Sequence, residues 1–304
     1  MSHAPRNRSN EPCPWLAVRL RTANTGVVRN WSLIFSAVCL VVLDVSRASE
    51  PLRHCADVRA LTREQAAENR PVTVRGVVTF AFAGGAAFVV QDETEGIYVG
   101  WTTEAKRGAG FESAGMTKPA IGMLVEVQGF TAPGGFAPVI RADDVKVVGV
   151  GELPPAHRQT LAQLWAGTLD SQRVEISGVV QRSHRSDEQE GQLRLEIATR
   201  DGRFSAFVAD PQGLDPDRLV DAELRLTGVC LTFFNPRGEA IGVRLHIADA
   251  GGVVIAQPPV ADPFAVPEVT PLALRPFART PPSPHRQRLA GVITVVRPGE
   301  FIYV

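Results

Sequence analysis

The stretch RPVTVRGVVT (residues 70–79) recurs twice in this chain of 304 residues, as QRVEISGVVQ (172–181) and as HRQRLAGVIT (285–294). Each copy contains a glycine followed by two β-branched apolar residues, apolar and polar residues alternate before that glycine in the first two copies, and the three glycines are 102 and then 113 residues apart. Alternation with a period of two, together with β-branched residues, predicts a β-strand. Because the strand returns at a nearly regular interval, the sequence predicts a duplicated domain.

A second strand and a helix start recur with the first. The segments LVEVQG (124–129) and AELRLTG (222–228) end in glycines that lie 53 and 50 residues after the glycine of the first strand. Thr62 and Thr160 precede the first strand of each unit, and each is followed three residues later by a glutamine, which is the spacing of a capping box at a helix start. Two ordered markers and a helix start make chance similarity between valine-rich strands the weaker interpretation.

Each unit has room for further strands between these markers. In the first unit, residues 88–91 and 97–101 flank an acidic turn, and in the second, residues 193–197 and 204–208 flank an Asp-Gly turn. Five short strands, with a glycine where the first strand must bend, favour a barrel of the oligonucleotide/oligosaccharide-binding (OB) type. A generic β-sandwich stays the alternative, because residues 102–121, where such barrels carry a helix, hold three glycines and one proline.

The predicted fold class is therefore all-β with short helices, built from tandem OB-like five-stranded barrels with a truncated third copy. The expected domains are a signal peptide or membrane anchor (1–48), a first OB-like domain (49–150), a second (151–256), and a linker with the start of a third (257–304).

The N-terminal segment has the features of an export signal. Arg19, Arg21 and Arg29 precede an uncharged run of 13 residues, 31–43, which is too short to span a membrane comfortably but suits the core of a signal peptide. Ser46 and Ala48 are the small residues that a signal peptidase requires, so cleavage is expected after Ala48, with an uncleaved anchor as the alternative. We therefore expect the remainder to be exported, periplasmic or associated with the cell envelope.

The charge balance argues against a protein that grips nucleic-acid phosphates. The whole chain has a formal net charge of zero, and the six arginines before residue 49 leave the remainder mildly acidic. Proteins that bind nucleic acid through phosphates are usually basic. The expected partner is a small ligand or a protein, nucleic acid is disfavoured, and a membrane would be contacted only through the N-terminal segment if it stays uncleaved.

The sequence holds no recognisable catalytic constellation. The histidines after residue 49 have no His or Cys at metal-ligand spacing, and no nucleophile elbow, phosphate loop or zinc-protease motif occurs. We expect a chain that is not an enzyme and has no cofactor. Cys230 lies in the apolar segment LTGVCLTFF and is expected to be a buried free thiol rather than the partner of Cys55.

Aromatic residues and arginines of the first unit are the candidate ligand-binding residues, because OB barrels stack bases or sugars on an aromatic face. Tyr98 is expected to point outward, since Ile97 and Val99 share the opposite face of their strand. The complete set is Tyr98, Trp101, Arg75 and Arg141.

The acidic turn after the second strand offers a weak metal candidate made of Asp92, Glu93 and Glu95. Carboxylates this close in sequence could hold Ca²⁺. The competing interpretation is that Asp92 nucleates the hairpin turn while the glutamates are solvated, and the second unit, with TRDGR at this place, keeps only one acid.

The order of motifs resembles the exported tandem OB-like sensor regions of certain bacterial membrane histidine kinases. The segments that carry the resemblance are VTVRGVVTF (72–80), FVVQDETEGIYV (88–99), GGFAPVI (134–140), DSQRVEISGVV (170–180), VDAELRLTGVC (220–230), FNPRGEAIGVRLHI (234–247) and PFARTPPSPHRQRLAGVITVVRPGEFIYV (276–304). The resemblance implies a non-catalytic sensor or scaffold module of a two-component receptor. Kinase activity is carried over to no residue here, since the phospho-acceptor and ATP-binding regions are missing from the sequence.

Two further expectations follow from the same segments. The alternative function is an exported OB protein that binds single-stranded nucleic acid or oligosaccharide directly.

At the C-terminus, FIYV (301–304) matches FVVQ (88–91), so the sequence ends at the turn of the first hairpin. We expect the chain to be a fragment of a longer protein and this tail to be loosely ordered or to pair through its exposed apolar edge.

Overall fold

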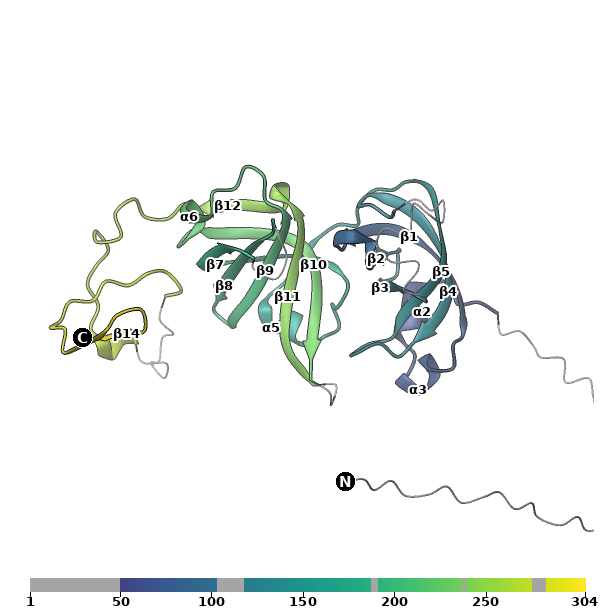
Figure 1. The fold of residues 1–304 in the computed structure, drawn as a ribbon, viewed down its shortest axis with the longest axis horizontal. Coiled ribbons are helices and arrows are strands. Elements are labelled where there is room, and N and C mark those ends of the chain that lie inside the picture. Colours follow the sequence, from purple (N-terminus) through teal and green to yellow (C-terminus); the bar gives the residue numbers. More distant parts are fainter. Residues whose placement is uncertain (1–49, 103–117, 187–190, 236, 238, 275–282) are drawn as a thin grey trace, which may run out of the picture. The chain divides into compact units, whose positions relative to one another are not determined.

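The computed structural model describes residues 50–102, 118–186, 191–235, 237, 239–274 and 283–304 (Figure 1). The expected signal peptide lies outside these residues. Among the residues that are described, none of the helices is both long and apolar enough to cross a membrane.

The first unit is a closed five-stranded barrel. Its strands are hydrogen-bonded in the order β1-β2-β3-β5-β4, and β4 returns to pair with β1. All neighbours are antiparallel except β3 and β5, which are parallel. This order is that of an OB barrel, in which a hairpin-connected β1-β2-β3 meander is closed by the last two strands. The strands are β1 (Pro71–Ala81), β2 (Phe88–Gln91), β3 (Gly96–Trp101), β4 (Met123–Ala132) and β5 (Val139–Val150).

The second unit repeats the topology. Its strands follow the order β7-β8-β9-β11-β10, and β10 closes onto β7, again with one parallel pair, β9 and β11. Closure of both sheets confirms OB-like barrels and excludes an open sandwich. The elements are β7 (Arg173–Arg185), β8 (Leu193–Thr199), β9 (Gly202–Asp210), α6 (Pro216–Leu219), β10 (Glu223–Phe234) and β11 (Ala240–Asp249), with β6 (His157–Arg158) beside β7 and β12 (Val253–Gln257) beside β10.

The glycines and the capping threonines that recur in the sequence have the same structural roles in both barrels. A methyl group on Gly76 would come within 2.6 Å of a side-chain carbon of the neighbouring strand, and one on Gly178 within 2.4 Å. Thr62 and Thr160 each form both hydrogen bonds of a capping box at the helices α3 (Arg63–Ala66) and α5 (Leu161–Trp165). Helix α2 (Cys55–Arg59) precedes α3.

Each barrel has its own apolar core. Inward residues of β1 to β5 surround the rings of Phe88 and Trp101, whose centroids are 5.7 Å apart. In the second barrel, leucines, isoleucines and valines of β7 to β11 enclose Cys230. Both Cys55 and Cys230 are buried free thiols, as expected.

The third repeat forms a short hairpin. Strands β13 (Val295–Arg297) and β14 (Phe301–Tyr303) pair with each other, and all six of their residues are exposed. The strand predicted around Gly291 is therefore shorter than expected: the segment 288–294 forms no strand, whereas the matching residues of the first barrel lie in β1. Within the described residues, the 3₁₀ helices are η1 (Ala83–Gly85), η3 (Ala250–Gly252) and η4 (Pro271–Leu274).

An apolar cluster joins the outer surfaces of the two barrels. Phe80 of β1 and Val89 of β2 are buried against Val229 of β10. Phe82, Tyr98, Ala209 and Leu231 pack around them. Burying an apolar side chain of this size stabilises a contact by about 1.5–3 kcal/mol, so this cluster holds the barrels together by hydrophobic burial.

A polar bridge lies beside this cluster. The guanidinium of Arg59 in α2 contacts Glu95 of the first barrel (Nε to Oε2, 2.9 Å) and Asp170 of the second (Nη1 to Oδ2, 3.3 Å). Asp170 also accepts a hydrogen bond from the backbone N–H of Thr232 at 2.7 Å. Since the Arg59 and Asp170 side chains are only 11% and 13% exposed, removing either one would leave a largely buried charge without its partner.

The backbones of the two barrels come close together at Gly96, the first residue of β3. A β-carbon there would lie 1.9 Å from the carbonyl oxygen of Ser171, which is itself tied to β10 by a hydrogen bond from its N–H to the Cys230 carbonyl. Only glycine allows this approach without moving the backbone.

We predict that Gly96→Ala lowers the free energy of unfolding by about 1–3 kcal/mol, because the added methyl group must push the second barrel away. Gly242→Ala in β11, where a β-carbon meets nothing within 4 Å, is the matched control and should change it by less than about 0.5 kcal/mol. Urea denaturation of both variants measures the effect. Equal stabilities would contradict the close approach.

Candidate functional site

The face that OB barrels commonly use for ligands is covered in the first barrel. That face is formed by the outer surface of the second and third strands. Here Val89 of β2 is fully buried and Tyr98 of β3 is half-buried, both within the cluster that joins the barrels. This face of the first barrel is therefore not open to a ligand.

The structure separates the four predicted ligand-binding residues. Trp101 lies inside the barrel, is 1% exposed, and its indole N–H donates to the carbonyl of Gly85 at 2.9 Å. The prediction that Trp101 contacts a ligand is wrong, because its indole ring is buried and exposes no surface to a ligand. Arg75 lines one pocket, whereas Tyr98 and Arg141 line another.

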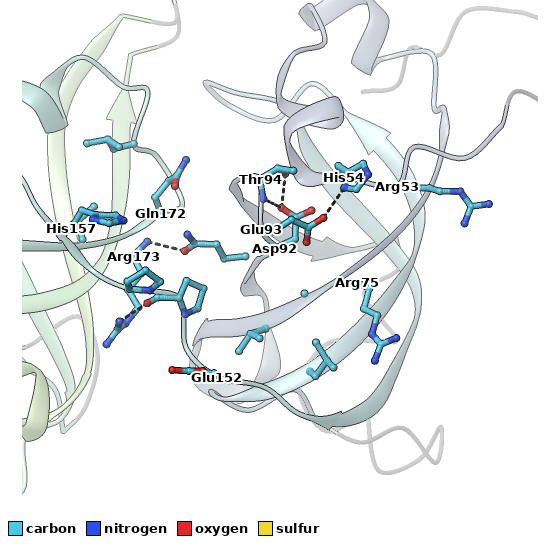
Figure 2. A pocket seen from close by; sticks show the side chains of 18 of the residues that line it. Arg53, His54, Arg75, Asp92, Glu93, Thr94, Glu152, His157, Gln172 and Arg173 are labelled. Atoms are coloured by element: carbon cyan, nitrogen blue, oxygen red, sulfur yellow. Dashed lines mark hydrogen bonds and ion pairs between the residues drawn. The ribbon is translucent and has the colours of Figure 1, made fainter.

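The first of these pockets, the junction groove, has a volume of about 910 Å³ and is lined by residues of both barrels and of the segment that links them (Figure 2). Arg75 of β1 lies on one wall, and Gln172 and Arg173 lie on the opposite side. The backbone N–H of Arg173 donates to the side-chain oxygen of Gln91 at 3.1 Å, and its guanidinium donates to the carbonyl of Pro154 at 2.6 Å.

The junction groove has mixed charge. Among the described residues, the guanidinium groups of Arg53 and Arg75 have no ion-pair partner, whereas that of Arg173 is held by a backbone carbonyl. Four acids share the lining, namely Asp92, Glu93, Glu126 and Glu152. Because acids at least balance the arginines, the groove offers no continuous positive surface for a polyanion.

The acidic turn has a structural role that explains Asp92. One carboxylate oxygen of Asp92 accepts the N–H of Cys55 at the start of α2 (2.8 Å), and the other accepts the N–H groups of Thr94 (2.8 Å) and Glu95 (2.9 Å). Burial alone would raise the pKa of Asp92, but these hydrogen bonds and one from the Thr94 hydroxyl outweigh it and hold the pKa below its ordinary value. Asp92 thus nucleates the turn, as the competing interpretation expected.

The predicted metal set does not converge on one point. Glu95 pairs with Arg59, and Glu93 lies 3.2 Å from Nδ1 of His54. His54, Asp92 and Glu93 do place ligand atoms within 4.8 Å of one another. Since the carboxylate of Asp92 is already saturated with hydrogen bonds, binding a cation would require the turn and the start of α2 to rearrange.

The second pocket, which we call the aromatic pocket, brings Tyr98 and Arg141 together. It has a volume of about 400 Å³ and lies where the β4–β5 loop of the first barrel meets the end of β10. Phe136 of that loop stacks on Phe234 of β10, with centroids 4.6 Å apart and planes 15° from parallel. Phe136 was not among the residues predicted from the sequence. The proximity of Phe233 and Phe234 to Tyr98 was not predicted either, because it depends on how the two barrels pack.

Three further titratable groups are buried in structural positions. Burial raises the pKa of the Cys55 thiol well above its usual range and that of Cys230 to about 12, so both thiols stay protonated and unreactive. Burial, with a smaller contribution from Arg244, lowers the pKa of His246 to about 4. The neutral His246 ring stacks on Phe207 (5.6 Å, 16°) and contacts Phe80 of the first barrel at 5.2 Å.

Comparisons with known proteins show no family. No protein-family model and no curated protein match the sequence. Solved structures match weakly: a murine DNA-binding protein bound to double-stranded DNA (11% identity, 62% of this chain, 99% of that chain, TM-score 0.28), the aspartyl-tRNA synthetase from Entamoeba histolytica (14%, 37%, 27%, 0.26) and the hypothetical protein ygiW from E. coli (18%, 33%, 92%, 0.24). The chain spans less than a third of the tRNA synthetases that it matches. Likenesses at these scores carry no argument about function.

We predict that stability falls as the pH drops from about 6.5 to 4, because the unfolded chain protonates His246 and the folded chain does not. The folded pKa of His246 lies below its ordinary value of 6.5, so this contribution is complete at pH 7 and is lost on acidification, by up to about 3 kcal/mol. His246→Phe should flatten this slope in urea denaturation, whereas His157→Phe, at an exposed position, should not. A slope unaltered by His246→Phe would contradict the buried neutral histidine.

Proposed function

We propose that this chain is a non-catalytic, exported recognition module, the sensor or scaffold part of a larger signalling receptor, in which the two barrels act as one ligand-binding body. The observation that carries the proposal is the burial of the β2–β3 face of the first barrel against the second. A barrel that bound its ligand alone would keep this face open. Burying it leaves the pockets between the barrels for recognition, and a ligand there would be sensitive to how the barrels are joined.

The positions of the reactive side chains support a role without catalysis. The thiols of Cys55 and Cys230 are buried with raised pKa values, and Asp92 is saturated by hydrogen bonds that hold a turn. His246 packs between aromatic rings. Catalytic groups need access to a substrate and a pKa near the working pH. These groups have neither.

Export is proposed from the N-terminal sequence and from the resemblance to exported sensor regions. Alkaline phosphatase fused after Val304 becomes active only where its disulfides form, outside the cytoplasm. In a Gram-negative host we expect at least about tenfold more activity from the full chain than from a matched fusion without residues 1–48. Equal activity of the two fusions would contradict export.

The competing function, direct binding of single-stranded nucleic acid, is tested by fluorescence anisotropy with a labelled oligothymidine of about 20 nucleotides. We expect no saturable binding below about 100 μM at physiological salt, because the exposed charges are balanced and the stacking face is covered. Saturable binding at lower concentration that weakens with added salt and is abolished by Tyr98→Ala would favour the competing function and overturn ours.

A further inference from the structure

We propose that the aromatic pocket is a binding site for a planar aromatic carboxylate, with the ring held among phenylalanine and tyrosine side chains and the carboxylate bound by Arg141. The inference rests on the proposed function, since it names a ligand class for the recognition module. It is carried by the shape, the aromatic lining and the charge of this one pocket.

The lining supplies aromatic surface from both barrels. Tyr98, Phe136, Phe233 and Phe234 all line the pocket, and each is half-buried rather than packed inside a barrel. Two contacts fix the rings: Phe136 stacks on Phe234, and the Arg244 guanidinium lies 4.0 Å from the centroid of Phe233. Fixed rings favour a flat aromatic ligand, because it can stack without the entropic cost of ordering the site.

Arg141 brings an uncompensated positive charge to this lining. No described residue forms a hydrogen bond or an ion pair with its guanidinium. Gly100, its partner on the parallel strand β3, leaves room for it: a β-carbon on Gly100 would lie 2.9 Å from Nη1 of Arg141 and 3.7 Å from Cε1 of Tyr98. The guanidinium and the Tyr98 ring therefore lie next to each other over the same residue, where one ligand can contact both.

The carboxylate of the lining, that of Asp170, is engaged by other donors. It lies 3.3 Å from the guanidinium of Arg59, which it shares with Glu95, and it accepts hydrogen bonds from the Ser171 hydroxyl (3.1 Å) and the Thr232 N–H (2.7 Å). Thr232 is 5% exposed, and its hydroxyl oxygen is buried and forms no hydrogen bond with any described residue. Among the described residues of the lining, the Arg141 guanidinium is therefore the charged group that is left to pair with a ligand, and charge complementarity favours an anion over a cationic ligand for an aromatic cage.

The dimensions suit a small ligand. A volume of about 400 Å³ lies within the range of about 300–1,000 Å³ typical of ligand sites, which are mostly apolar with few well-placed polar groups. A guanidinium binds a carboxylate through two parallel hydrogen bonds, which fixes the orientation of a planar acid.

The probe is 2-naphthoate, titrated by isothermal calorimetry into the full chain. We expect saturable binding with a dissociation constant between about 10 μM and 1 mM, the range for a rigid ligand of this size. The neutral 2-naphthamide should bind at least about tenfold more weakly, because it lacks the charge that pairs with Arg141.

Variants separate the contribution of the Arg141 charge to binding from that of the aromatic rings. Arg141→Met should weaken 2-naphthoate at least about tenfold and leave 2-naphthamide within about twofold, and Arg141→Lys should fall between, because a lysine cannot bind in the bidentate manner. Phe234→Ala should weaken both probes by a similar factor. Arg203→Met, at an exposed arginine of β9 that is outside the pocket, is the matched control and should bind both probes as the wild type does. Denaturation curves verify that every variant is folded.

Three results would overturn the inference: no heat of binding with 2-naphthoate at concentrations of about 5 mM, binding that Arg141→Met leaves unchanged, or tighter binding of benzyltrimethylammonium than of 2-naphthoate, which would indicate a cation cage. The proposed function fails separately, through absence of export or through salt-sensitive binding of oligothymidine. If the chain is exported and binds neither the oligonucleotide nor 2-naphthoate, the proposed function stands and only this ligand class is ruled out.

Discussion

Burial of one barrel's outer strand face against the other is the interaction on which the rest of this structure depends. Phe80 and Val89 of the first barrel are buried because Val229 of the second barrel packs against them. Hydrophobic burial has no direction of its own, so the polar bridge of Arg59 and Asp170 and the close approach at Gly96 fix how the surfaces meet. The junction groove and the aromatic pocket are consequences of that contact.

Much of the fold could be predicted because it is encoded locally. The alternation around Gly76 and Gly178, the capping boxes at Thr62 and Thr160, and the Asp-Gly turn each act over a few residues, and each occurs where the sequence places it. Duplication strengthened these signals, since a pattern that occurs twice at one spacing is hard to assign to chance. The third repeat shows the limit of this reasoning: the strand pattern is present, but only three residues on each side of its turn pair, because a hairpin without the other strands gains little burial.

The site was less predictable, for two different reasons. The error at Trp101 was avoidable, because Trp101 has the same parity along β3 as the inward-facing Ile97 and Val99, whereas Tyr98 has the opposite parity. The aromatic pocket was not predictable, because its stacked pair, Phe136 and Phe234, comes from two barrels about a hundred residues apart in sequence. No local sequence pattern indicates how two barrels pack against each other.

The central claim is that the two barrels form one rigid body, and residual dipolar couplings of backbone amides test it most directly. Couplings from β1–β5 and from β7–β11 should fit a single alignment tensor with the orientation of the barrels seen here, because the buried cluster and the Arg59–Asp170 bridge hold them together. Two tensors of clearly different magnitude would show that the barrels reorient independently, and would contradict a recognition site built between them.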